Sequence, residues 1–183
     1  MLRLLYVLIL GLVGAGIVHI SILFMLPSYS ERDVWSKLSA VAAPYTVVKL
    51  GPDIMDGSAV AAANPLLLAA ACRFDLAEAP VRVQSEGSVP FWSLSIYDNN
   101  GLNNFSITDR TSNDRALDFI ALSPAQMQEI RGRVPEEFDR SVFVESGLEE
   151  GVVLVRVFLS DDTWQGAVDA FLRNLSCRPL DLS

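Results

Sequence analysis

The hydrophobic residues of this chain follow two different patterns. From Leu4 to Leu26 the chain has 23 consecutive residues without a formally charged side chain, whereas the rest alternates short apolar runs with polar turns. About 20 apolar residues cross a bilayer as a helix, and a soluble helix of this length normally has a polar face. The pattern therefore predicts a transmembrane anchor at residues 1–27, followed by a soluble domain at residues 28–183.

A cleavable signal peptide is the main alternative for the N-terminal segment. Its apolar region usually has ~7–15 residues and ends in small residues at the cleavage site. Here the apolar run is longer and the following "MLPSYS" contains no Ala-x-Ala pattern, so we predict that the anchor is retained. Arg3 precedes the helix, and the positive-inside rule then places the N-terminus in the cytoplasm. The bulk of the chain is expected in the periplasm or outside the cell.

Three residues of the predicted helix, Gly11, Ala15 and His19, are spaced four apart and form one stripe. Small residues let another helix approach closely, so the stripe is a candidate helix–helix contact with His19 hydrogen-bonded across it. The alternative is a neutral His19 that bonds to its own helix or to interfacial water. Both interpretations fit the sequence.

The clearest strand pattern runs from residue 91 to residue 108. In "FWSLSIYD" and "NFSITD", apolar residues alternate with serine or threonine, which predicts two strands that each bury one face. The connection Asp98–Asn104 contains residues that tolerate the backbone angles of a tight turn. We predict an antiparallel hairpin whose buried side chains are Trp92, Leu94, Ile96, Phe105 and Ile107.

The other segments predict further strands and helices. Residues 66–76 fit either a helix or a strand, and the exit into "APVRVQSE" favours strands from near Cys72, with a hairpin there. A turn at 149–151 is expected between two later strands. The predicted strands have the sequences "YTVVKL", "ALDFIALS", "SVFVES" and "GVVLVRVFLS".

Helix signals occur at three places after the anchor. A short helix is predicted to begin at an N-cap, Ser30, with Val34, Leu38 and Val41 on one face. Ser123, Pro124 and Gln126 predict a capped helix over 124–132, and Asp161 or Asp162 caps a last helix. The apolar stripe of that last helix contains Trp164, Val168, Phe171, Leu172 and Leu175. The predicted fold class is α+β: one transmembrane helix, then a mostly antiparallel β-sheet domain with two or three helices.

Charge and histidine content exclude several function classes. The formal charge is −8 and the sequence pI is about 4.6, so we expect no nucleic-acid partner. The one histidine lies in the anchor, and the soluble domain therefore cannot form a Ser-His-Asp or Cys-His site. Two cysteines are too few for an all-cysteine zinc site, and no Gly-rich phosphate loop is present. We predict no catalytic residue, no cofactor and no metal site.

A polar cluster around the predicted hairpin contains Asp98, Asn99, Asn103, Asp109 and Arg110. Its oxygen atoms could bind a hard cation, but their spacing does not match an EF-hand, and Asn and Asp are also common turn formers. Turn chemistry accounts for every one of these residues. Asp109 and Arg110 form either a local ion pair or part of a binding rim, and the ion pair is the simpler interpretation.

Cys72 and Cys177 are the only cysteines, 105 residues apart. In an exported domain, two cysteines favour one disulfide, which would join the last helix to the early strands. Two buried free thiols are the alternative.

Several stretches together resemble a known family. They are "GAGIVHISILFMLPSYSERDVWSKL", "CRFDLAEAPVRV", "PFWSLSIYDNNGLNNFSITDR", "SVFVE" and "WQGAVDAFL". The chain resembles the short membrane-anchored proteins of the domain of unknown function 1254 family, which are typical of alphaproteobacteria. The resemblance implies a bacterial inner-membrane location. Larger relatives carry a second uncharacterised domain, number 1214, so the resemblance also implies a partner protein with that domain. The larger relatives are β-rich. The family has no established activity, so no catalytic residue is carried over.

Three functions are compatible with the sequence. The leading hypothesis is a single-pass inner-membrane protein whose periplasmic domain binds a protein partner or an envelope ligand and is not an enzyme. The second is an envelope enzyme that acts on glycans through carboxylates, for which Asp98 and Asp109 would have to converge in a cleft. The third is a structural subunit of a membrane complex, docked through the Gly11-Ala15-His19 stripe.

Overall fold

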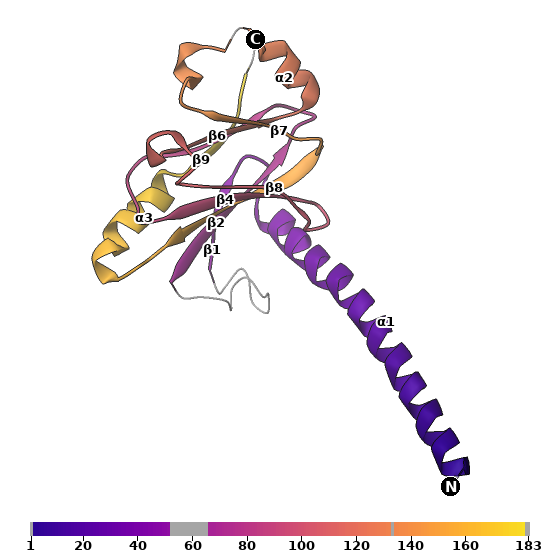
Figure 1. Ribbon diagram of the computed structural model, residues 1–183. Helices are drawn as coiled ribbons and strands as arrows, with labels where there is room; N and C mark the ends of the chain where they lie inside the picture. The colour runs from indigo at the N-terminus through magenta and orange to yellow at the C-terminus, as the bar shows by residue number, and fades with distance from the viewer. Residues whose placement is uncertain (1, 52–65, 133, 182–183) are drawn as a thin grey trace.

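Two β-sheets pack face to face in the domain that follows the N-terminal helix (Figure 1). The computed structural model describes residues 2–51, 66–132 and 134–181. The five-stranded sheet is antiparallel throughout and has the order β1-β2-β8-β4-β5. Its strands are β1 (Val47–Leu50), β2 (Leu67–Asp75), β4 (Trp92–Asp98), β5 (Asn103–Thr108) and β8 (Glu150–Phe158).

The four-stranded sheet has the order β7-β6-β3-β9. Only the β6–β7 pair is parallel. The strands are β3 (Val81–Ser85), β6 (Leu117–Leu122), β7 (Val142–Glu145) and β9 (Ser176–Pro179). Together with the helices, the two sheets confirm the predicted α+β class, with antiparallel pairing dominant.

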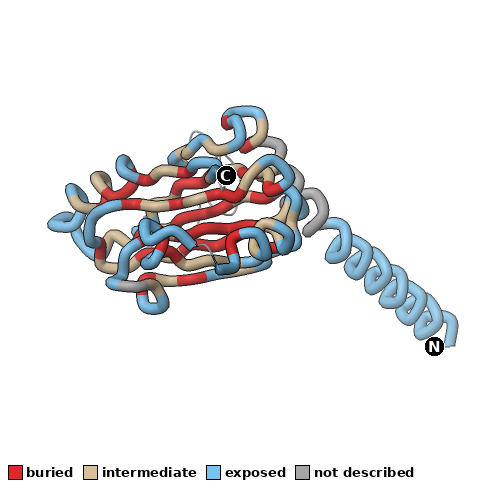
Figure 2. Tube along the Cα trace, turned by 90° about the horizontal axis from the view of Figure 1, so that it is seen from above, coloured by how far each residue is buried: buried red, intermediate tan, exposed pale blue. Residues whose placement is uncertain are grey.

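The main core lies between the two sheets, where Figure 2 shows buried residues along the strands. β8 illustrates the cause: Val153, Val155 and Val157 alternate along the strand, point to the same face and are almost completely buried. The outer face of each sheet is covered separately. α2 (Pro124–Ile130) and the 3-10 turn η2 (Glu136–Phe138) cover the four-stranded sheet, and the end of α1 (Leu2–Val41) covers part of the five-stranded sheet.

The structure confirms the predicted hairpin. β4 and β5 pair antiparallel, with Leu94 opposite Ile107 and a bulge beyond Ile96. Trp92, Leu94, Ile96 and Ile107 are buried and Phe105 is half-buried, as the alternation predicts. The connection between the strands is shorter than expected, because β4 extends to Asp98 and β5 begins at Asn103.

Of the three predicted helix caps, the one at Ser123 is confirmed and the one at Asp161 forms one 3-10 turn ahead of the last helix. Ser123 accepts a hydrogen bond from the Gln126 backbone, and the Gln126 side chain bonds back to the Ser123 backbone, which completes the capping box of α2. Asp161 caps the 3-10 turn η3 (Asp162–Trp164), which leads into α3 (Gln165–Asn174). Trp164, the first residue of the predicted stripe, is exposed. The members that are buried are Val168, Phe171, Leu172 and Leu175.

Two predicted strand connections are wrong. No hairpin joins β2 to β3, because β2 lies in the five-stranded sheet and β3 in the other. The turn expected at 149–151 lies earlier in the chain, because β7 ends at Glu145 and β8 already begins at Glu150. Residues 66–76, which fit a helix or a strand, contain the strand β2, Leu67–Asp75.

The prediction of a separate helix that begins at Ser30 is also wrong. α1 runs without interruption from Leu2 to Val41, through the expected boundary at residue 27. Leu38 is buried, whereas Val41 is exposed, and the side chain of Val34 lies outside the described part of the structure. Leu38 and Ala42 pack against Ala71 and Leu154 on the outer face of the five-stranded sheet. The last turns of α1 therefore belong to the domain's packing.

Candidate functional site

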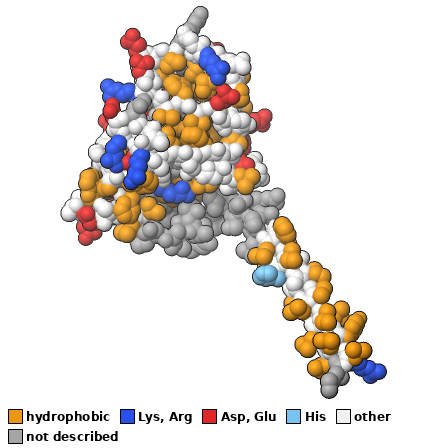
Figure 3. All heavy atoms as spheres, in the orientation of Figure 1, with side chains coloured by type: hydrophobic (Ala, Val, Ile, Leu, Met, Phe, Trp, Pro, Cys, Tyr) orange, Lys and Arg blue, Asp and Glu red, His pale blue; other side chains and the backbone are white. Residues whose placement is uncertain are grey.

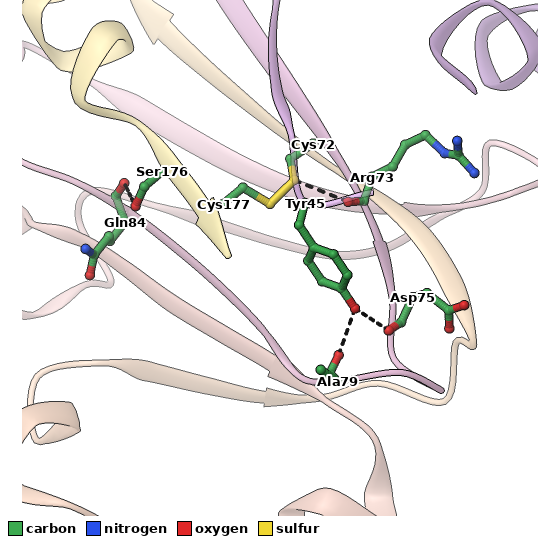
Figure 4. The surroundings of a disulfide bond; sticks show 8 residues. All are labelled: Tyr45, Cys72, Arg73, Asp75, Ala79, Gln84, Ser176 and Cys177. Carbon is green, nitrogen blue, oxygen red and sulfur yellow. Dashed lines mark hydrogen bonds between the residues drawn. A yellow bond between two sulfur atoms is a disulfide. The ribbon is translucent and has the colours of Figure 1, made fainter. Parts of the chain in front are cut away.

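The Cys72–Cys177 disulfide joins the two sheets across the core (Figure 4). Cys72 lies on β2 and Cys177 on β9, with their Cα atoms 6.5 Å apart, within the usual range for a bridge. The prediction of a bridge is confirmed, but Cys177 is on a strand after the last helix and not on the helix. Both cysteines are almost completely buried, so the bridge stabilises the sandwich and is poorly accessible to reductants.

Tyr45 fixes the turn that follows β2 (Figure 4). Its hydroxyl donates to the backbone carbonyls of Asp75, at 2.6 Å, and Ala79, at 3.3 Å. Tyr45 has a positive φ of 61°, which is costly for a non-glycine residue and is held by these contacts. Burial raises the pKa of the Tyr45 hydroxyl, which therefore remains a donor at neutral pH.

Arg73 joins α1 to the five-stranded sheet. Its guanidinium lies 4.8 Å from the centre of the Trp35 ring and donates to the Ala42 carbonyl at 3.4 Å. A cation at the C-terminal end of a helix interacts favourably with the helix dipole. The sequence did not indicate this junction, because its partners are about 30 residues apart along the chain.

The apolar half of α1 extends away from the domain. Leu2–Met25 is long and apolar enough to cross a membrane, a property that a signal sequence shares, and none of it is buried. Figure 3 shows hydrophobic side chains along most of α1, with the one histidine among them. Gly11, Ala15 and His19 are exposed on this segment, so the stripe is free to contact another helix.

The predicted polar cluster does not form one site. Asp98 Oδ1 accepts hydrogen bonds from the backbone of Asn100, at 2.9 Å, and Leu102, at 2.8 Å, as in an Asx turn. The Asn99 side chain accepts a hydrogen bond from Asn100 Nδ2 at 3.0 Å, the one side-chain hydrogen bond found for it among the described residues. These contacts are those of a turn, and among the described residues no group of three or more His, Cys, Asp or Glu could hold a metal ion.

Asp98 and Asp109 lie at opposite ends of the hairpin. The six residues of β5 separate them, roughly 20 Å at the usual rise of a strand. Glycosidase carboxylates lie roughly 5–9.5 Å apart. The pair required for a carboxylate enzyme therefore does not converge.

Asp109 is buried at the open end of the hairpin and pairs with Arg115, not with Arg110. Arg115 Nε donates to Asp109 Oδ2 at 2.9 Å, and Arg115 Nη2 contacts the same oxygen. The local Asp109–Arg110 ion pair is therefore wrong, and Arg110 is exposed. Sequence spacing could not reveal the true partner, because the turn between them places Asp114 and Arg115 at positive φ.

A second polar network covers the outer face of β4, β5 and β8. Arg156 Nη2 donates to the Tyr97 hydroxyl at 3.2 Å, and Ser106 Oγ donates to Ser95 Oγ at 3.0 Å. Asn103 Nδ2 donates to Ser106 at 2.9 Å, so this member of the predicted cluster joins the network. Burial raises the pKa of Tyr97, but the hydrogen bond and charge of Arg156 outweigh it and lower that pKa overall.

A shallow groove lies between the turn after β2, α2 and the end of β9. It has a volume of about 380 Å³, and Glu78, Glu129 and Asp181 are its acidic residues. Glu78 and Glu129 belong to different elements, so the groove presents carboxylates from several parts of the fold. The sequence did not indicate it.

These features define a disulfide-bonded α+β sandwich domain carried on a long apolar helix. Within that class, the chain belongs to the family described as "Protein of unknown function (DUF1254)", which matches residues 46–179. The match begins just after α1 and covers the sandwich domain up to the end of β9.

Two solved structures share the fold. The VPA0106 protein from Vibrio parahaemolyticus aligns with a TM-score of 0.57 and 18% identity, over 84% of this chain and 36% of that chain. A putative uncharacterized protein from Burkholderia cenocepacia aligns with a TM-score of 0.50 and 16% identity, over 85% of this chain and 41% of that one. The chain therefore spans less than half the length of either structure. No curated protein matches the chain.

Proposed function

We propose that this protein is a single-pass inner-membrane protein whose periplasmic domain binds a protein partner or an envelope ligand. The observation that carries the proposal is a buried inter-sheet disulfide in a domain that a long apolar helix carries. Disulfides persist in oxidising compartments such as the bacterial periplasm and are rare in the cytosol. Together with Arg3 before the helix, the disulfide supports a cytoplasmic N-terminus and a periplasmic domain.

The continuous helix supports a role at a fixed distance from the membrane. From Met25, where the apolar segment ends, to Leu38, which docks on the sheet, α1 rises about 20 Å. Arg73 and Trp35 hold that docked end. The domain is thereby held clear of the lipid headgroups, where a partner can reach it.

The family resemblance supports a protein partner, because larger relatives carry a second uncharacterised domain beside this one. We propose that the partner is a protein with that second domain. The two solved structures are longer than this chain, and more than half of each has no counterpart in it. This chain would then be one half of a two-protein assembly.

Affinity purification of the full-length chain from membranes in a mild non-ionic detergent tests this proposal. The expected result is a stoichiometric partner whose sequence corresponds to the part of the solved chains that this protein does not cover. The same chain with Gly11→Leu and Ala15→Leu, called the leucine control below, shows which part of the chain makes the contact, because it changes the helix stripe and keeps the domain and its charges intact. Purification of the chain alone, after chemical cross-linking in intact cells, would contradict the proposal.

A structural-subunit role is the second candidate, and the exposed Gly11-Ala15-His19 stripe favours it. If the partner docks through this stripe, the leucine control loses the partner while the domain keeps its melting temperature. If the partner docks on the domain, the control retains it. The separation of Asp98 and Asp109 argues against the glycan-hydrolase alternative.

A further inference from the structure

Hydrogen bonds hold both the side chain and the backbone of Arg115. Its Nε donates to Asp109 Oδ2 at 2.9 Å and its Nη2 donates to the Pro90 carbonyl at 3.0 Å. Its own carbonyl accepts a hydrogen bond from Trp92 Nε1 at 2.8 Å. Backbone and guanidinium are therefore both held, and the side chain has little freedom left.

This arrangement is energetically costly. Asp109 is 1% exposed, and its Oδ1 is buried without a hydrogen-bond partner. Buried polar atoms without partners are rare in folded proteins and call for an explanation. Asp114 and Arg115 also have φ angles of 53° and 59°, in the left-handed region that non-glycine residues seldom occupy.

The fixed guanidinium nevertheless presents an open edge to solvent. The Arg115 side chain is 63% exposed, and no hydrogen bond of its Nη1 is found among the described residues. Arg110 lies in the turn directly after Asp109, closed by the Thr111 N–H bond to the Thr108 carbonyl, and is also exposed. A buried carboxylate thus orients one arginine outward while a second cation lies in the same loop.

We propose that Arg115, oriented by Asp109, and Arg110 form a binding site for an oxyanion: a carboxylate or phosphate group of a ligand or partner. A guanidinium whose inner edge is fixed by a carboxylate offers its outer donors in a set geometry, which suits planar or tetrahedral oxyanions. In a chain of net charge −8, the exposed guanidinium groups of Arg110 and Arg115 provide local positive charge, although the exposed carboxylate of Asp114 lies in the same loop. The inference rests on the proposed binding role and names the chemistry of what is bound.

The alternative is a purely structural role, in which Arg115 only holds the loop over Trp92. That role uses the hydrogen bonds of Arg115 to Asp109 and Pro90 and needs neither the exposed edge of its guanidinium nor Arg110. Arg110→Gln therefore separates the two, because it leaves the Asp109–Arg115 pair and the fold in place. Arg173→Gln on α3 is the matched control, since it removes one exposed positive charge elsewhere.

The test is a titration of the isotope-labelled full chain, in non-ionic detergent at low salt, with inorganic phosphate and separately with acetate. The Arg115 Nε–Hε resonance is followed. We expect a saturable shift that Arg110→Gln weakens by about threefold, the effect of one exposed charge pair, and that Arg173→Gln leaves unchanged. Saturation with phosphate alone assigns a phosphate ligand, saturation with acetate alone assigns a carboxylate, and saturation with both assigns the class that binds with the lower dissociation constant.

Three results would overturn the inference: no saturation at millimolar concentrations of either anion, an Arg110→Gln affinity equal to wild type, or equal weakening by Arg173→Gln. Arg115→Gln, checked for an unchanged melting temperature, should abolish the shift of the remaining loop resonances. Failure of the anion-binding inference is distinguishable from failure of the proposed function, because membrane retention and co-purification of a partner are measured independently of anion binding.

Discussion

Replacing Trp92 with Ala should cost more stability than any other single change in the hairpin. Trp92 is 2% exposed and lies in the core between the sheets. Its indole N–H also holds the Arg115 carbonyl at 2.8 Å. The substitution therefore removes packing and a hydrogen bond together.

The two losses set the magnitude. Truncating a buried Phe or Trp to Ala typically costs about 3–5 kcal/mol, and a lost hydrogen bond adds about 1 kcal/mol. We expect a loss of about 4–6 kcal/mol, which is a large part of the stability of a typical domain. Trp92→Phe keeps an aromatic ring but removes the donor, so it should cost about 1–3 kcal/mol.

Urea unfolding of the full-length chain in non-ionic detergent, followed by circular dichroism of the strands, measures both variants. Equal slopes of free energy against urea are required for a valid comparison. A loss below about 2 kcal/mol for Trp92→Ala, or equal losses for the two variants, would refute the assignment of Trp92 as a packed core residue with a bonded indole.

Four further predictions follow from the structure. Cys72→Ala/Cys177→Ala should lower the unfolding free energy by ~4–5 kcal/mol, because the bridge closes a loop of 105 residues; an unchanged urea midpoint would contradict this. Intact-mass measurement of protein from membranes should show a retained N-terminal segment, and a mature terminus beyond residue 26 would disprove the anchor. Asn99→Ser should change stability by less than ~0.5 kcal/mol and leave partner binding intact, since the one side-chain hydrogen bond found for Asn99 in the described part of the chain is to its neighbour; loss of binding at a normal melting temperature would return it to the candidate sites. The folded pKa of Tyr45 is raised, so its contribution to stability is present below pH 10.0 and is lost as pH rises through the folded pKa; Tyr45→Phe should lack this alkaline decrease in a pH series of urea titrations.

The parts of the fold that the sequence predicts are those with local causes. The β4–β5 hairpin combines strict alternation with a turn that Asn and Gly favour, and slipping the register would expose Leu94 and Ile96 together. The α2 cap follows from three residues in sequence. Such signals need no knowledge of distant segments.

The errors arise where distant segments decide the structure. β2 is rich in alanine and fits a helix locally, yet Ala70 faces the other sheet while Ala71 faces α1, so both faces of a strand are buried. Which sheet β3 joins depends on β6 and β9, not on its neighbour β2. β9 has four residues and ends in proline, too short a pattern to predict.

The candidate sites show the same division. The turn role of Asp98 was predictable, because its bonds reach only residues 100 and 102. The Asp109–Arg115 pair depends on two residues with positive φ, and the Arg156–Tyr97 bond joins residues 59 apart in sequence. No local pattern carries that information.

Protease accessibility in spheroplasts tests the central claim most directly. An anchored periplasmic domain predicts that added protease degrades the C-terminal domain of the full-length chain while a cytoplasmic marker survives, and that undigested chain sediments with membranes. Protection of the domain until the cells are lysed, or its recovery as a soluble periplasmic protein, would contradict the account.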